Sequence, residues 1–87
     1  ILSLESLRTL GLESTFISDA GVVKLAQMKN LEELNLSRTN VSDSSVAALG
    51  KMKQLRSLYL YETKMSRNSM EILRQMLPQC RIAGSED

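Results

Sequence analysis

The chain repeats itself every 24 residues, and this period constrains its fold more than any other feature. The segment LRTLGL at 7–12 recurs as LEELNL at 31–36 and as LRSLYL at 55–60, with steps of 31 − 7 = 24 and 55 − 31 = 24. Seven apolar columns run through the copies: Leu7, Leu10, Leu12, Ile17, Val22, Leu25 and Met28; Leu31, Leu34, Leu36, Val41, Val46, Leu49 and Met52; Leu55, Leu58, Leu60, Met65, Met70, Leu73 and Met76. At an apolar content of 43%, independent placement would produce this with odds on the order of one in 10⁸.

Each copy combines a strand pattern with a helix pattern. Leu10 and Leu12 are spaced by two, so they point to one side of a strand. Val22, Leu25 and Met28 are spaced by three, which is a helical spacing. So short a unit cannot bury its own apolar side, and the copies must therefore stack, with the strands forming a parallel sheet and the helices lying behind it.

Polar columns mark where the helices begin. A serine precedes the helical part of every copy, at Ser18, Ser42 and Ser66. A serine oxygen at this place caps a helix by accepting a free backbone N–H. Asp19 and Asp43 follow the first two serines and add negative charge at the positive end of the helix dipole. Arg67 replaces this aspartate in the third copy, so we expect that helix start to be less well stabilised.

These residues resemble a known repeat. The pattern LxxLxLxxTxΦ(S/T)D, with Φ apolar, is similar to the threonine-bearing leucine-rich repeat common in bacterial proteins and also seen in eukaryotic ones; here it stands as LRTLGLESTFISD, LEELNLSRTNVSD and LRSLYLYETKMSR. The resemblance covers nearly the whole chain. It implies an α/β right-handed leucine-rich-repeat solenoid of about three strand–helix repeats, with a parallel sheet on the concave face and short helices on the convex face. It also implies a protein-binding role.

The predicted boundaries follow the period. We assign 1–6 to the tail of a preceding repeat, 7–30, 31–54 and 55–82 to repeats 1 to 3, the last with a closing segment, and 83–87 to a polar tail. Pro78 should stop the third helix, after which Cys80 and Ile82 return to cover repeat 3. Ile1 and Leu4 continue two apolar columns, but the amino edge has no matching cover. We therefore expect a longer array, or an edge that something covers, self-association being one possibility.

Composition excludes several classes of function. The chain has no histidine and only one cysteine, Cys80, which we expect to be a packed apolar residue. We find no catalytic constellation, metal-ligand spacing or cofactor motif, and we expect no enzyme activity. A net charge of +1 and 3% aromatic residues argue against nucleic acid as a partner. No apolar stretch approaches the ~18 residues of a membrane span, so no membrane association is expected. No signal peptide pattern is present, which slightly favours the cytoplasm.

Residues between the strand leucines should point outward and form a grid on the concave face. We expect Thr9, Gly11, Glu13, Glu33, Asn35, Ser37, Ser57, Tyr59 and Tyr61 there, and all of them except Gly11 are our candidates for partner binding. Both tyrosines of the chain lie on one strand, and tyrosine is enriched at binding hot spots. The alternative is that the two rings simply pack against neighbouring copies.

Other repeated columns have structural explanations. Arg8, Glu32 and Arg56 alternate in sign on neighbouring strands, as do Arg38 and Glu62, which predicts a solvated ladder of weak ion pairs. The threonine column, Thr15, Thr39 and Thr63, is expected to bond the turn backbone of adjacent copies. Asn35 and Asn40 begin triplets that fit the glycosylation pattern, and we expect both to be unmodified.

Two functions remain from the sequence. The first is a non-catalytic scaffold that binds another protein, of unknown identity, through the concave face. The alternative is a structural cap or spacer of a larger protein, with no recognition role of its own.

Overall fold

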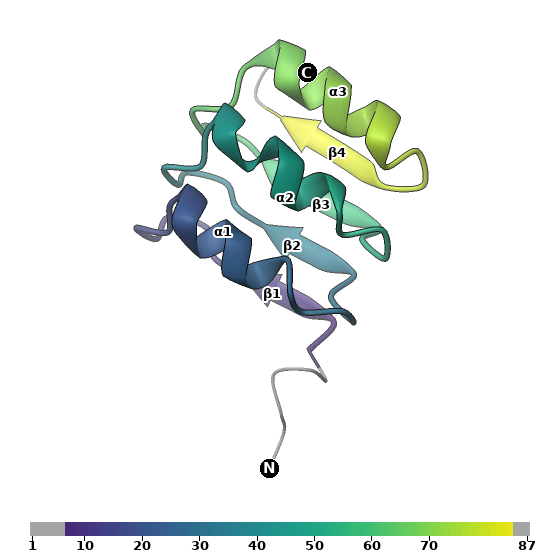
Figure 1. Cartoon of the computed structure of the whole chain (residues 1–87). Helices are drawn as coiled ribbons and strands as arrows, with labels where there is room; N and C mark the ends of the chain where they lie inside the picture. The colour runs from purple at the N-terminus through teal and green to yellow at the C-terminus, as the bar shows by residue number, and fades with distance from the viewer. Residues whose placement is uncertain (1–6, 85–87) are drawn as a thin grey trace.

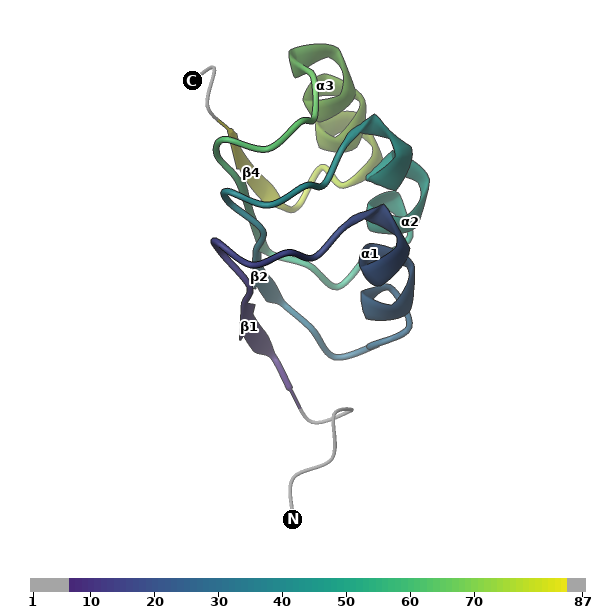
Figure 2. The same ribbon diagram turned by 90° about the vertical axis from the view of Figure 1, so that its left-hand side faces the viewer.

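The computed structural model describes residues 7–84 as two layers, one of strands and one of helices (Figure 1). The strands are β1 (Thr9–Gly11), β2 (Glu33–Asn35), β3 (Ser57–Leu60) and β4 (Arg81–Gly84), and they form one parallel sheet in the order β1-β2-β3-β4. The helices are α1 (Asp19–Leu25), the 3₁₀ turn η2 (Asp43–Ser45) that leads into α2 (Val46–Gly50), and α3 (Arg67–Met76). Figure 2 shows the helices stacked along one side of the sheet. The α/β solenoid expected from the repeat is confirmed.

The strand register follows the sequence period. Leu10 pairs with Leu34, Leu34 with Leu58, and Leu58 with Ile82. The first three of these residues therefore occupy one column that faces the helices, as alternation along a strand requires. Leu34 and Leu58 are both fully buried in the common core.

The end of the sheet differs from the predicted boundary. Ile82 returns to the sheet as expected, but the returning segment is a full fourth strand that extends to Gly84. Ala83 and Gly84, which the sequence pattern assigned to a polar tail, belong to β4. Gly84 aligns with Leu60, and a Cβ atom at Gly84 would overlap the Met70 side chain. Glycine here lets α3 approach the last strand closely.

The threonine column closes the turn within its own repeat. The hydroxyls of Thr15, Thr39 and Thr63 donate to the carbonyl oxygens of Leu12, Leu36 and Leu60, three residues earlier, at 2.6, 2.7 and 3.1 Å. The expectation that these hydroxyls link adjacent copies was wrong. The residue before each threonine lies in the left-handed region, with φ of 61° at Ser14, 57° at Arg38 and 56° at Glu62. The hydroxyl bond thus holds a turn that an ordinary residue adopts reluctantly.

The aspartate column links neighbouring repeats. Asp19 accepts hydrogen bonds from the Ser42 backbone N–H at 2.8 Å and from the Ser42 hydroxyl at 2.6 Å, and it also accepts from the Ser45 hydroxyl. Asp43 accepts from the Ser66 backbone N–H at 2.7 Å, one repeat further on.

The lower stability expected at the helix start that carries Arg67 stays a prediction, since the first turn of α3 has no acidic residue. The aspartates bond forward to the next repeat, and Ser66 still caps α3 by accepting from the Ser69 N–H at 3.2 Å. α3 is the longest helix among residues 7–84, with 10 residues. By contrast, Ser18 makes no side-chain capping bond at α1.

Burial is uneven along the stack. The leucines of repeats 2 and 3 are fully buried, whereas Leu7, Leu10, Leu12 and Leu25 of repeat 1 are only partly buried. Within residues 7–84, repeat 1 has a neighbour on one side only, which accounts for the difference. Ile1 and Leu4 lie outside the described residues.

Candidate functional site

The outward positions of the four strands form a surface that we call the outer sheet face. Two rows cross it in register: Thr9, Glu33, Ser57 and Arg81 in one, and Gly11, Asn35, Tyr59 and Ala83 in the other. Glu13 and Tyr61 continue the face just beyond β1 and β3. The parallel ladder also continues there, with the Leu36 N–H donating to the Tyr59 carbonyl at 2.9 Å and the Arg38 N–H to the Tyr61 carbonyl at 2.7 Å.

Two residues of this face were missed in the sequence. Arg81 and Ala83 occupy the β4 positions of the two rows. Their places follow from the same period, 57 + 24 = 81 and 59 + 24 = 83, but Gln79 and Gly84 interrupt the leucine pattern in the last segment. Only the 24-residue period, and not the leucine pattern, could have identified Arg81 and Ala83 from the sequence.

The tyrosines lie outside the core. Tyr61 is 43% exposed, and Tyr59 is half-buried beside it on the face. The backbone around Tyr61 is held on two sides, because its N–H donates to the Ser37 hydroxyl at 3.1 Å and its carbonyl accepts from Arg38. Its ring is therefore presented from a fixed backbone.

Ser37 does not share this exposure. It is only 8% exposed, and its hydroxyl accepts the Tyr61 N–H. The expectation that Ser37 stands among the outward contact residues was wrong, because its small side chain is covered and already bonded. It supports Tyr61 instead.

A hollow lies over Gly11 on the outer sheet face. It has a volume of about 220 Å³ and is lined by Thr9, Leu10, Gly11, Glu33, Leu34, Asn35 and Tyr59. A Cβ atom at Gly11 would meet no atom within 4 Å, so the missing side chain leaves open space. Asn35 lines this space, and its amide group donates to Glu13 while its oxygen accepts the Ser37 N–H at 3.0 Å. Both ends of the Asn35 amide therefore take part in hydrogen bonds.

Several charged side chains on and near the outer sheet face form ion pairs, but one that lines the hollow does not. Arg8 lies 3.4 Å from Glu32, as the predicted ladder requires. Arg38, which shares a predicted column with Glu62, lies 3.8 Å from Glu13 and donates to the Ser14 hydroxyl at 3.0 Å. The Glu33 carboxylate has no ion-pair or hydrogen-bond partner within residues 7–84, so it is the unpaired charge on the rim.

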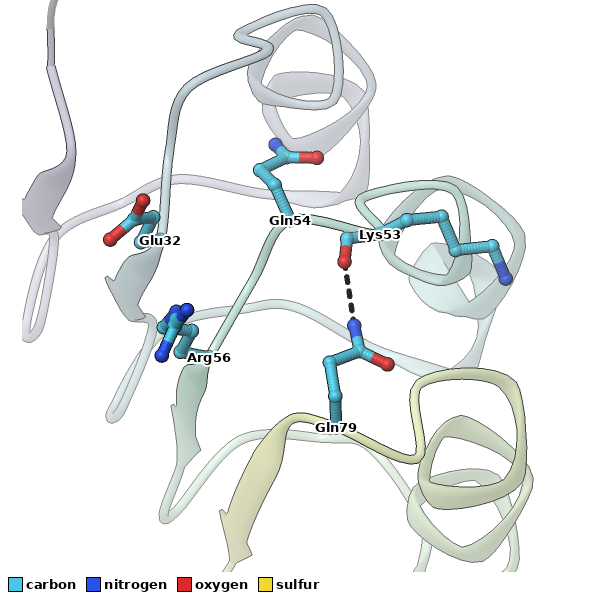
Figure 3. Close-up of a pocket in the computed structure, with 5 residues that line it drawn as sticks. All are labelled: Glu32, Lys53, Gln54, Arg56 and Gln79. Carbon is cyan, nitrogen blue, oxygen red and sulfur yellow. Dashed lines mark hydrogen bonds between the residues drawn. The ribbon is translucent and has the colours of Figure 1, made fainter.

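A second depression lies where the chain passes from the helices back to the strands. It has a volume of about 340 Å³ and is lined by Glu32, Lys53, Gln54, Arg56 and Gln79 (Figure 3). The amide of Gln79 donates to the Lys53 carbonyl at 2.6 Å, and that of Gln54 to the Met28 carbonyl at 3.0 Å. The two glutamines thus tie neighbouring loops together, and this depression has a structural explanation.

The described residues offer few side chains that could catalyse a reaction or bind a metal ion. Cys80 is buried in the core, and burial raises the pKa of its thiol above the usual value. Over residues 7–84, no three histidine, cysteine, aspartate or glutamate side chains gather closely enough to hold a metal ion. In the same part of the chain, none of the helices has the length and apolar character needed to cross a bilayer.

Comparison with known proteins agrees with this geometry. The model of the leucine-rich repeat family matches residues 5–65. The chain belongs to the leucine-rich-repeat family. Domains of this family generally serve as non-catalytic scaffolds for protein–protein interaction. The finer assignment to the threonine-bearing subtype remains a prediction.

Solved structures show the same leucine-rich-repeat fold. The structure of the Mex67:Mtr2 subunits from Chaetomium superposes with a TM-score of 0.69 at 23% sequence identity, over 95% of this chain and 56% of the matched chain. This likeness concerns the fold alone, and the repeats here span little more than half of the matched chain. A search of curated proteins found no matching relative.

Proposed function

We propose that these repeats form a non-catalytic module that binds another protein through the outer sheet face. The observation that carries the proposal is the tyrosine pair on the outer sheet face, exposed Tyr61 and half-buried Tyr59, of which Tyr59 lines the hollow over Gly11. Tyrosine supplies a large contact area at a low cost in side-chain entropy, and it is enriched among residues that dominate binding energy.

The fold itself does not need these rings. The positions of Tyr59 and Tyr61 are occupied in repeat 1 by Gly11 and Glu13, and in repeat 2 by Asn35 and Ser37. Repeats 1 and 2 thus have small or polar side chains at these positions within the same stack. Aromatic bulk at these two places therefore favours recognition over packing.

The size of the face supports a further part of the proposal, that these repeats belong to a longer array. Four strands about 4.8 Å apart span roughly 15 Å, which is small for a standard interface of about 800 Å² per partner. Ile1 and Leu4 continue the apolar columns of the repeat, and Leu7, Leu10 and Leu12 are only partly buried. A preceding repeat would cover these leucines and lengthen the face.

Site-specific photo-cross-linking in cells that make the parent protein tests the proposal. A photoreactive phenylalanine analogue replaces Tyr61 in one variant and Glu71, an exposed residue of α3, in the matched control. We expect a discrete cross-linked protein from position 61 and none from position 71. Unlabelled Tyr59→Ala/Tyr61→Ala protein should lose co-purification of that partner and keep its melting temperature.

The structural alternative makes the opposite prediction. If the repeats only cap or space a larger protein, the double alanine variant should lower the melting temperature and leave every co-purified protein in place. Cross-linking from position 71 but not from position 61 would also contradict the proposal.

A further inference from the structure

The hollow over Gly11 has the size of a side-chain site. Sites for free small ligands usually measure about 300–1,000 Å³, and this hollow of about 220 Å³ is smaller. It is open toward the outer sheet face, where a protein partner would lie under the proposed function. One long side chain of such a partner fits the space better than a free ligand does.

The glycine that creates the hollow is not required by the backbone. None of the glycines within residues 7–84 has a positive φ, and Gly11 is the last residue of β1, in ordinary register with Asn35. Glycine in a strand often marks the close approach of another group. Space for an incoming group is therefore the property that glycine supplies here.

The rim specifies the chemistry of that group. Glu33 offers an exposed carboxylate without a partner among residues 7–84, whereas Glu13 is already matched by Arg38 and Asn35. Tyr59 also lines the hollow, and a cation is attracted both to a carboxylate and to an aromatic face. Thr9 adds a hydroxyl that can accept a hydrogen bond.

The opposite end of the same row carries the opposite charge. Arg81 lies two strands from Glu33, with Ser57 between them, a distance of roughly 10 Å. The charge at the Glu33 end is thus separated from the cation on β4. A cationic side chain of a partner is attracted to the hollow and repelled from the Arg81 end.

From the free carboxylate, the aromatic wall and the open space, we propose that the hollow over Gly11 receives an arginine side chain of the partner protein. The guanidinium group pairs with Glu33 and lies against the Tyr59 ring, a combination that suits a planar cation better than an ammonium group. This inference rests on the proposed function and specifies the chemistry of its partner.

Nuclear magnetic resonance titration of the isotope-labelled chain tests the site without a known partner. The probe is N-acetyl-arginine amide, and N-acetyl-glutamine amide is the neutral control. We expect saturable shifts of the Thr9, Gly11 and Asn35 amide signals with the arginine probe and none with the glutamine probe. Glu33→Gln should weaken binding about tenfold, because the charge-assisted bonds are lost.

Filling the hollow is the sharper test. Gly11→Leu places a side chain in open space, so the fold should persist while the arginine probe loses its shifts at Thr9 and Asn35. Val23→Leu, an exposed helix position, is the matched control and should bind as the parent does. Binding that survives Gly11→Leu, or an equal response to the glutamine probe, would overturn the inference. Cross-linking from position 61 would still succeed in that case, which separates this failure from a failure of the proposed function.

Discussion

Repeats 1 and 2 have the same sequence pattern but very different burial. Leu31, Leu34 and Leu36 are all 0% exposed, whereas their counterparts Leu7, Leu10 and Leu12 are only partly buried. Repeat 2 lies between two neighbours in the sheet, and repeat 1 has β2 as its neighbour on one side only within residues 7–84.

This comparison shows where a repeat obtains its stability. In a stack, each unit gains burial from the units beside it, so an identical leucine contributes more in the middle than at an edge. The hydrogen bonds between repeats depend on a neighbour in the same way, because the Asp19 carboxylate of repeat 1 accepts from Ser42 and Ser45 of repeat 2. Matched substitutions in equivalent columns measure this dependence directly.

The largest effect should come from the leucine column. Leu34→Ala removes a fully buried side chain and should lower the free energy of unfolding by about 2–5 kcal/mol. Leu10→Ala should cost roughly half as much or less, because the Leu10 side chain is already partly in water. Urea denaturation followed by circular dichroism measures both. Equal losses would show that the leucines of repeat 1 are covered as fully as those of repeat 2.

A smaller effect should come from the link between repeats 1 and 2. Partial burial raises the pKa of Asp19, but the hydrogen bonds from Ser42 and Ser45 outweigh it and hold the pKa below its usual value of 3.8. A carboxylate with a lowered pKa stabilises the fold above that usual value, and the contribution is lost as the pH falls through the folded-state pKa. Asp19→Asn should therefore cost about 1–2 kcal/mol near pH 7 and progressively less below about pH 4.

The equivalent link between repeats 2 and 3 provides the control. The pKa of Asp43 is lowered by hydrogen bonds from the Ser66 backbone and the Ser69 side chain, but its carboxylate lies at the exposed surface. Asp43→Asn should also lower the stability near pH 7 and lower it less at acidic pH. The loss should be smaller than for Asp19→Asn, since solvent screens an exposed group. Denaturation series at several pH values measure both variants. A pH-independent loss for Asp19→Asn would contradict the carboxylate link.

The smallest effect should come from the threonine column. Thr39 is 6% exposed, and its hydroxyl donates to Leu36, whereas Thr15 makes the same bond to Leu12 at the exposed surface. Thr39→Val should cost about 1 kcal/mol because it leaves a covered carbonyl without its donor, and Thr15→Val only a few tenths. Thermal unfolding by calorimetry resolves the difference. A larger loss at Thr15 would contradict the dependence on burial.

Much of the fold was predictable from the sequence because the same pattern occurs in three successive copies. The columns of leucine specify which side of each strand faces inward, and the period specifies the register, as the pairing of Leu34 with Leu58 confirms. Where the pattern breaks, the prediction failed. Gln79 and Gly84 concealed the fourth strand, because neither continues the leucine pattern. The Met70 side chain fills the space where a Gly84 side chain would lie, a contact that no local pattern reveals.

The candidate site was predictable only in part. Alternation along β3 predicts that Tyr59 points outward, and the structure places it there. The same rule placed Ser37 outward, yet Ser37 is covered because its hydroxyl bonds the next strand. The hollow over Gly11 depends on where Asn35 turns its amide, which Glu13 and the Ser37 N–H decide. The Asn35–Glu13 and Tyr61–Ser37 hydrogen bonds join residues 22 and 24 positions apart, about one repeat.

The sequence by itself determined the period, the strand–helix order and the inward columns, because these depend on residue spacing along one chain. Only the tertiary structure decided which copies are fully buried, where the aspartates bond and where the face is hollow. Each of these depends on what the neighbouring repeat places beside a residue. In a solenoid the local pattern specifies the repeat unit. The contacts between units determine how far each residue is buried and how much it contributes to the free energy of unfolding.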